Sequence, residues 1–532
     1  MARFFGIIRE YGSRYVLRET GYFNMQSSRF FVKIISVTPR QAAVWPYLFV
    51  VAGFAVCFQD FPGIWGPDLH AMHTQMLSGQ YFDWHPPVLV AFWGLMNTAW
   101  NTMTGMTVTG SEVLYVVHAM MLWGGLAFLA RSGRGFFVDF IGTSRWRFCL
   151  VGILLSVVLV EMVVIIRYPQ KDVAMMASYV LAVGILCNFP KRTVWKVLVG
   201  ACCMLLIFYG TAVRYNAIFS ALPLLFLLAA KYRSRPAQLP QFSQSPPPEL
   251  IQSTRSSRTW PPVVFSLLLW GLLLAGIQGM NDGVLKATKQ HSMQEIFYGD
   301  IWRLNYATQT FDLPPPVKGV GWAPLTEDVF FRLYRERPYI KQAFQDINDY
   351  YLQSDSYPDI LSSGQGVAVY HVMYRPDSLG VRYCRDFTGA EDDYRQLVMA
   401  WKSKVLKHPL PYMKYKANSF ASLLFDFSFM GVNGAWYFAF TAGVFCVWAV
   451  RRMKKWALGD ITPWCVTLSG LLYVLPYLIF LPDISRRYLY WFYVASLFGA
   501  VWFAGAAWMK HAAQRRNSHS ESPRERVRPR IA

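Results

Sequence analysis

Long apolar runs separated by short polar breaks occupy most of this chain. A helix that crosses a bilayer needs about 17 to 25 predominantly apolar residues. Ten runs meet or approach this length, at 44–60, 111–130, 148–166, 173–189, 195–213, 216–230, 260–280, 433–450, 461–481 and 488–508. The pattern therefore predicts an all-α polytopic membrane protein with about ten transmembrane helices.

An eleventh apolar stretch, 88–103, decides the topology of everything that follows it. Counted as a span, it would invert the rest of the chain. We instead expect it to lie along the outer surface, because the Lys-rich and Arg-rich segments then become cytoplasmic, as the positive-inside rule requires. These segments are 1–43, 131–147, 190–196, 231–258, 451–455 and 510–532, and they hold more than half of the 52 Lys and Arg residues.

Composition agrees with membrane embedding. Hydrophobic residues make up 54% of the chain and charged residues only 16%, which is too apolar for a pair of ordinary soluble domains. A net charge of +21 is compatible with nucleic-acid binding, an acidic membrane surface or topology-setting loops. Because the basic residues gather in the predicted cytoplasmic segments, we expect membrane lipids and no nucleic acid as partners.

The polar segments divide the chain into five parts. The linker 234–258 is rich in Pro, Ser and Gln, so we expect it to be disordered. The stretch 281–431 is aromatic and mixed in charge, which is typical of a soluble domain outside the membrane. The predicted parts are a basic cytoplasmic or interfacial segment (1–43), a transmembrane module (44–280) with a first outer loop (60–110), an external mixed soluble domain (281–431), C-terminal transmembrane helices (432–509) and a basic disordered cytoplasmic tail (510–532).

Polar residues that border the predicted spans on the outer face come from four places in the chain. These are 66–87, 167–173, 214–216 and 482–491. Charged groups next to hydrocarbon are costly unless they face water, a partner or a substrate. We therefore expect these four segments to converge on one outer-face site.

The first outer loop supplies three of the candidates. Asp68 follows a Gly-Pro turn and is placed to act as a general base, or alternatively to cap the helix predicted over 69–77. Asp83 and His85 come just before the double Pro that starts the surface stretch, where they contact substrate or form the turn.

Two later breaks supply further polar candidates. Lys171 and Asp172 lie between the third and fourth predicted spans, where they contact substrate or only mark the membrane boundary. Arg214 and Asn216 interrupt an otherwise continuous apolar run, and an outer-face Arg there opposes the positive-inside rule.

The last break holds Arg486, Arg487 and Tyr488, which oppose the same rule. The planar fork of Arg suits a phosphate group, because it donates two parallel hydrogen bonds. The open alternative for these arginines is an ion pair inside the bundle with Asp172 or Asp483.

A metal site is not specified. His70 and His73 share a helical face, which permits metal binding, but the sequence indicates no third ligand. We assign no cofactor and leave a divalent metal open.

In order and predicted membrane side, these elements resemble the polytopic GT-C glycosyltransferases, especially the branch of the lipid A aminoarabinose transferases and protein O-mannosyltransferases and related bacterial membrane proteins. The resemblance covers roughly 44–220 and 461–508. The matching elements are Pro67-Asp68, Gln75, His85-Pro86-Pro87, Lys171-Asp172, Arg214 with Asn216, and Arg487-Tyr488.

The resemblance implies roles for three of these residues. Asp68 matches the general base of the first outer loop, Asp172 the acid of the second outer loop, and Arg214 a basic residue near the donor phosphate. One departure concerns the metal, because Asp68 is followed by Leu69 where the family usually has a second acid.

The implied reaction is an inverting transfer of a sugar from a polyprenyl-phosphate donor to a glycan, lipid or protein acceptor. Arg214, with Arg486 or Arg487, would stabilise the leaving phosphate. The implied location is a bacterial inner membrane with the site facing the periplasm. Two alternatives remain: an O-antigen ligase or polymerase, and a transporter or flippase of an anionic lipid-linked substrate.

Overall fold

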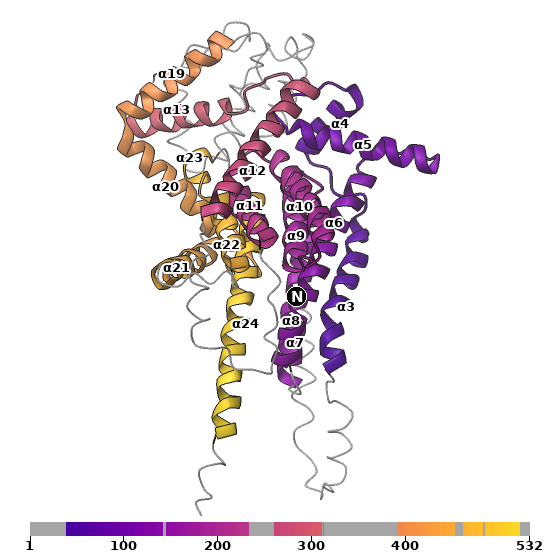
Figure 1. Cartoon of the computed structure of the whole chain (residues 1–532). Coiled ribbons are helices and arrows are strands. Elements are labelled where there is room, and N and C mark those ends of the chain that lie inside the picture. Colours follow the sequence, from indigo (N-terminus) through magenta and orange to yellow (C-terminus); the bar gives the residue numbers. More distant parts are fainter. Residues whose placement is uncertain are drawn as a thin grey trace, which may run out of the picture.

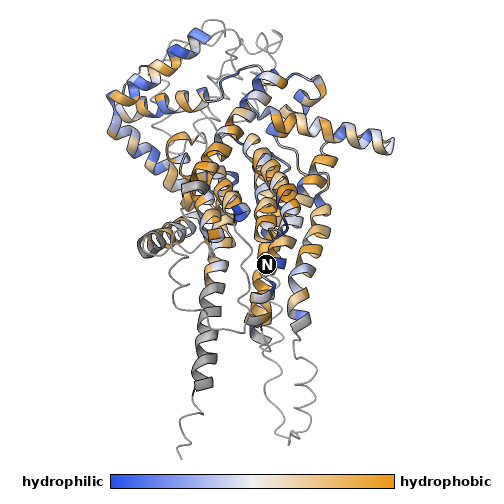
Figure 2. Cartoon of the chain, in the orientation of Figure 1, coloured by the Kyte–Doolittle hydropathy of each residue, from blue (hydrophilic) through white to orange (hydrophobic). Residues whose placement is uncertain are grey.

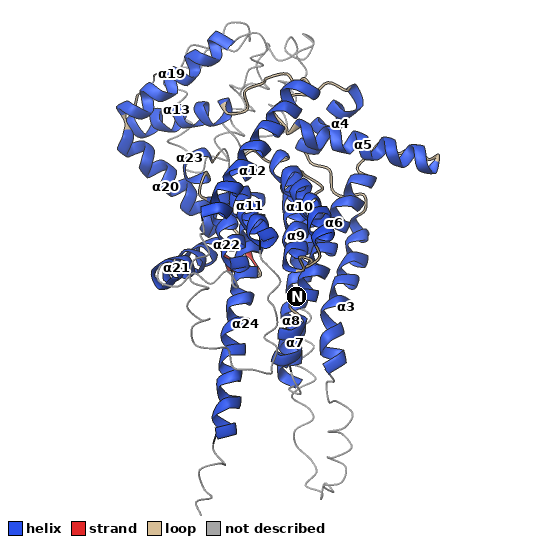
Figure 3. Ribbon diagram, in the orientation of Figure 1, coloured by secondary structure: helices blue, strands red, loops and turns tan. Residues whose placement is uncertain are grey.

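The computed structural model describes residues 39–141, 145–233, 260–310, 312, 391–452, 461–481 and 485–521. This part of the chain is mostly helical (Figure 3). Its one small sheet pairs strands β1 (Ser428–Phe429) and β2 (Val432–Asn433) in an antiparallel hairpin. The predicted linker 234–258 and most of the predicted segment 1–43 lie outside the described residues.

The helices form a bundle with further elements gathered at one end (Figure 1). The bundle contains α3 (Pro39–Cys57), α6 (Glu112–Ser132), α7 (Arg134–Ile141), α8 (Arg145–Ile166), α9 (Lys171–Cys187), α10 (Thr193–Ala212), α11 (Ala217–Arg233), α12 (Trp260–Gln278), α21 (Gly434–Arg452), α22 (Ile461–Val474) and α24 (Tyr490–Glu521). Shorter or end elements are η1 (Phe58–Asp60), α4 (Pro67–Ser78), α5 (Pro87–Thr104), the π-helix η3 (Gly279–Val284), α13 (Gln294–Thr308), α19 (Glu391–Lys407), α20 (Pro409–Asp426), α23 (Tyr477–Phe480) and η5 (Arg486–Leu489).

Seven helical stretches within the described residues are long and apolar enough to cross a membrane. They are Ala43–Asp60, Glu112–Ser132, Arg147–Ile166, Thr193–Ala212, Pro262–Val284, Ile461–Phe480 and Arg486–Gly505. The prediction of a mostly helical integral membrane protein is confirmed at this level, and Figure 2 shows the apolar residues along the bundle.

Three of the ten predicted spans are not among these seven stretches. Helices α9 and α11 each have 17 residues, and α21 (Gly434–Arg452) is not among the seven stretches. At a rise of 1.5 Å per residue, a 17-residue helix covers about 26 Å, which is at the lower limit for a hydrocarbon core of roughly 30 Å. The count of ten spans therefore stays a prediction.

Helix α9 lies at the centre of the bundle and is buried along nearly its whole length. It packs on α6, α10, α11 and α24. Close approach to α6 depends on two glycines: a Cβ atom at Gly125 would lie 2.6 Å from the Leu181 nitrogen, and one at Gly184 would lie 2.6 Å from the Gly125 oxygen. Small residues of this kind let membrane helices pack backbone to backbone.

Helix α5 lies across the end of the bundle instead of along it (Figure 1). It contains no charged residue and is not among the seven stretches. This arrangement agrees with the expectation that 88–103 is not a span.

The same end carries α13, α19 and α20, which include the described part of the predicted external domain 281–431 (Figure 1). Phe297, Ile301 and Leu397 form a small core between α13 and α19. Beside it, Lys416 Nζ lies 2.6 Å from Asp300 Oδ1, with both side chains buried. Residues 313–390 lie outside the described part, so an external domain stays a prediction.

The C-terminal boundary differs from the predicted one. Helix α24 continues to Glu521, well into the segment 510–532 that we expect to be disordered. The sequence between 510 and 521 contains Ala, Lys, Gln and Arg and no Gly or Pro, so a helix that begins in the apolar span can propagate through it.

Candidate functional site

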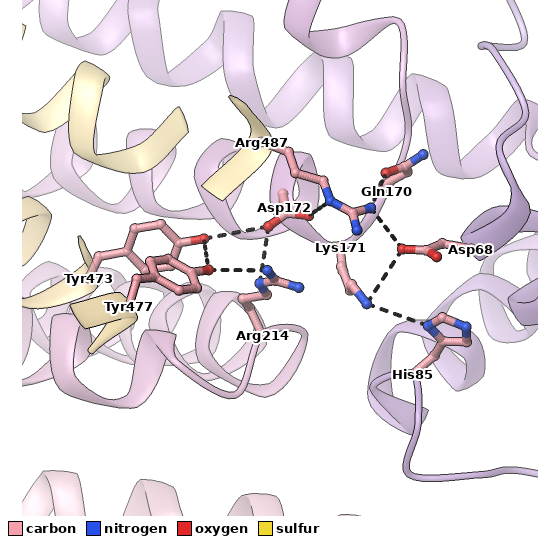
Figure 4. Close-up of polar contacts among 9 residues, drawn as sticks. All are labelled: Asp68, His85, Gln170, Lys171, Asp172, Arg214, Tyr473, Tyr477 and Arg487. Atoms are coloured by element: carbon pink, nitrogen blue, oxygen red, sulfur yellow. Dashed lines mark hydrogen bonds and ion pairs between the residues drawn. The ribbon is translucent and has the colours of Figure 1, made fainter. Parts of the chain in front are cut away.

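Four segments that are far apart in the chain meet at the end of the bundle near α4 (Figure 4). They are the first turn of α4, the first turn of α9, the α10–α11 loop and η5. The predicted convergence is therefore present in the structure, and it brings seven predicted residues together: Asp68, His85, Lys171, Asp172, Arg214, Arg487 and Tyr488.

Asp68 is the second residue of α4 and is only 3% exposed. Gly66 is the N-cap of this helix, and no side chain caps it, so the capping alternative for Asp68 does not hold. Its Oδ2 atom lies 2.8 Å from Arg487 Nη1 and 3.6 Å from Lys171 Nζ. Asp68 is thus a carboxylate held between two cations.

Asp172 is the second carboxylate of the cluster and is 1% exposed. Its Oδ1 atom lies 3.0 Å from Arg214 Nε and accepts a hydrogen bond from the Tyr473 hydroxyl at 3.5 Å. Arg487 Nε approaches the other oxygen at 3.9 Å. Arg214 and Arg487 therefore pair with Asp172 inside the bundle, which was the alternative to phosphate binding. Phosphate binding stays a prediction.

Arg214 is surrounded by tyrosines as well as by Asp172. Its Nη2 atom donates to the Tyr477 hydroxyl at 3.1 Å, and its guanidinium lies 4.9 Å from the centre of the Tyr488 ring. Although burial alone disfavours the charged form, the Asp172 carboxylate raises the pKa of Arg214 well above its usual value. Arg214 is thus a permanent cation in this site.

Lys171 connects the cluster to the first loop. Its Nζ atom lies 3.5 Å from Nδ1 of His85, which is fully buried. An ammonium that donates to Nδ1 leaves the ring proton of the neutral imidazole on Nε2. Pro86 is the N-cap residue of α5, so His85 has no capping role there.

Three predicted residues do not join the network. Asp83 Oδ1 accepts a hydrogen bond from the Gln290 backbone N–H at 2.5 Å, and burial raises the pKa of Asp83 above its ordinary 3.8. Arg486 Nη2 lies 2.5 Å from Glu161 Oε2 in α8. The Asn216 side-chain nitrogen is buried without a hydrogen-bond partner among the described residues.

The structure adds residues that the sequence patterns do not single out. Gln170 accepts a hydrogen bond from Arg487 Nη1 at 3.3 Å, and the Tyr477 hydroxyl donates to that of Tyr473 at 3.5 Å. The signals for the two tyrosines are hydroxyl groups one helical turn apart inside an apolar run. Glu161, the partner of Arg486, is the one acid inside the run 148–166.

The described residues do not fit a divalent metal. No group of three or more His, Cys, Asp and Glu side chains within the described ranges is placed to hold one. The neighbours of Asp68 in the network are cations, which would repel a metal ion. His73 Nε2 instead lies 2.9 Å from the Thr109 carbonyl oxygen.

The charge of the site favours an anion. Asp68 and Asp172 provide two negative groups, whereas Lys171, Arg214 and Arg487 provide three positive ones. In a buried, low-dielectric place such an excess attracts a negative ligand strongly. A phosphate could lie among the three cations, beside a carboxylate able to accept a proton.

Comparison with protein-family models, with curated proteins and with solved structures finds no match.

Proposed function

We propose that this chain is an integral-membrane glycosyltransferase that moves a sugar from a polyprenyl-phosphate donor to an acceptor hydroxyl or amine. The observation that carries the proposal is the buried cluster itself. A carboxylate, Asp68, lies within ion-pair distance of Lys171 and Arg487 at one end of an apolar bundle, where the phosphate of a membrane-anchored donor would arrive.

The chemistry follows from these positions. Asp68 accepts the proton of the acceptor group, whose lone pair attacks the anomeric carbon of the sugar. The bond between that carbon and the phosphate oxygen breaks, and its electron pair stays on the phosphate. Arg487, Lys171 and Arg214 stabilise the charge that develops there. A single displacement of this kind inverts the sugar's configuration.

The finer parts of the proposal rest on the charge topology and on the resemblance. They are an outer-face site in a bacterial inner membrane and a glycan, lipid or protein as acceptor. Of the two adjacent arginines, we assign Arg487 to the phosphate, because it lies beside Asp68 in the cluster, whereas Arg486 faces Glu161 of α8.

The test is transfer of radiolabelled sugar from a polyprenyl-phosphate-sugar pool by the purified full chain. Asp68→Asn keeps the shape of the side chain but removes the base, so we expect a loss of about a hundredfold or more. Asp60→Asn is the matched control, because Asp60 also pairs with an arginine, Arg167, at 3.0 Å near the same end. Thermal melts in detergent check that both variants fold.

Two outcomes would count against the proposal. Equal transfer by wild type and Asp68→Asn would show that Asp68 is not the base and would direct attention to Asp172. No transfer by the wild type from a donor pool of proven activity would remove the transferase proposal and favour a ligase, polymerase or transporter.

A further inference from the structure

The Asp68 carboxylate already pairs with Arg487 and Lys171, the two cations that a donor phosphate would need. Arg487 Nη1 and Lys171 Nζ both face Asp68 Oδ2, at 2.8 and 3.6 Å. Asp68 is 3% exposed, so water contributes little to screening these contacts. As drawn in Figure 4, the proposed base and the proposed phosphate site neutralise each other.

We propose that Asp68 is gated by the donor. Before the donor binds, its carboxylate serves as the counter-ion of Arg487 and Lys171. When the donor phosphate arrives, it takes over both cations and releases Asp68 to accept the acceptor's proton. The donor therefore binds before the acceptor is activated. This inference rests on the proposed function.

The exchange keeps both cations neutralised, because one anion replaces another. Removing a carboxylate from two buried cations without a substitute leaves uncompensated charge in a low dielectric, which is strongly unfavourable. A phosphate that enters as Asp68 is released keeps Arg487 and Lys171 neutralised throughout. Its oxygens also accept the paired N–H groups of a guanidinium better than a single carboxylate oxygen does.

Arg487 is suited to change partner. Besides Asp68, it donates to the neutral amide of Gln170 at 3.3 Å and approaches Asp172 at 3.9 Å. These two contacts can hold the side chain while its link to Asp68 is replaced. Asp172 is less suited to release, because Arg214 and Tyr473 also engage it.

The test measures binding of a polyprenyl monophosphate, without sugar, to the purified chain in lipid nanodiscs. Asp68→Asn removes the competing anion, so we expect it to bind the lipid roughly tenfold more tightly than the wild type, the size of one charge-assisted hydrogen bond. Asp60→Asn undergoes the same chemical change at another arginine pair and should bind like the wild type.

A loosened or partly unfolded site would bind the lipid phosphate more weakly. Tighter binding by Asp68→Asn therefore distinguishes gating from a purely structural role of Asp68. If Asp68→Asn does not fold, Asp68→Ala is the second variant with the same expectation. Unchanged or weaker binding by a folded variant overturns the gate and leaves the proposed donor in place. Failure of the wild type to bind the lipid phosphate counts against the proposed function itself.

Discussion

Within the described residues, two buried clusters of opposite charges are built differently. Between α13 and α20, Lys416 Nζ meets Asp300 Oδ1 at 2.6 Å, and the Trp401 indole N–H donates to Asp300 Oδ2 at 3.0 Å. At the end of the bundle, Asp68 and Asp172 share three cations at distances from 2.8 to 3.9 Å.

The difference shows how a structural ion pair can be told apart from the candidate site. In the Asp300 cluster each carboxylate oxygen has a close partner of its own. Burial raises the pKa of Asp300 and lowers that of Lys416, so desolvation outweighs the attraction within the pair. In the bundle-end cluster the contacts are longer and Arg487 is shared between two acids, so a new anion can be accommodated by re-pairing.

The largest expected effect is the loss of stability when the pair between Lys416 and Asp300 is broken. Lys416→Met leaves Asp300 buried without its cation and should lower the free energy of unfolding by about 3–5 kcal/mol. Adding Asp300→Leu should restore most of that loss, because an apolar pair avoids the desolvation. Chemical denaturation of the three proteins measures both effects, and a single variant as stable as the wild type would contradict the picture of a tight pair.

The next largest effect is on sugar transfer, when Arg487 is removed from between Asp68 and Asp172. Arg487→Gln should lower the rate of sugar transfer by about 10²–10³-fold, as expected when one charge-stabilising donor is lost, with a smaller change in thermal stability than Lys416→Met. Arg167→Gln is the control, since Arg167 pairs with Asp60 outside the network. Equal losses of transfer in both variants would mean that Arg487 acts only through the fold.

A smaller effect is expected when Arg486 is substituted instead of its neighbour Arg487. The Arg486 and Glu161 side chains are 30% and 18% exposed, so solvent screens their pair. Arg486→Gln should change stability by about 1 kcal/mol or less and leave transfer near the wild-type rate. A loss of transfer comparable to that of Arg487→Gln would show that Arg486 also takes part in transfer.

The smallest effect concerns Asp83 and depends on pH. Because the folded-state pKa of Asp83 lies above 3.8, its contribution to stability is greatest below that value and falls as the pH rises through the folded-state pKa. Asp83→Asn keeps an acceptor for Gln290 without the charge. Melts across the acidic range should show the variant slightly more stable than the wild type near neutral pH and equal to it at low pH. A less stable variant at neutral pH would show that the charge itself is needed.

The sequence by itself determined the membrane class and the neighbourhood of the site. Apolar runs of span length report directly on burial in hydrocarbon, and charged groups beside them are rare enough to mark a polar cluster. Asp68, Lys171, Asp172, Arg214 and Arg487 are all recognisable in this way.

Only the tertiary structure decided which of these residues meet. Arg486 and Arg487 are neighbours in η5, yet one turns to Glu161 in α8 and the other to Asp68 in α4. The partners of Asp68 lie more than a hundred residues away along the chain, and Asp83 is held by Gln290 instead. Side-chain direction within a helical turn and packing between distant helices set these pairs, and neither is encoded in the local spacing of polar residues.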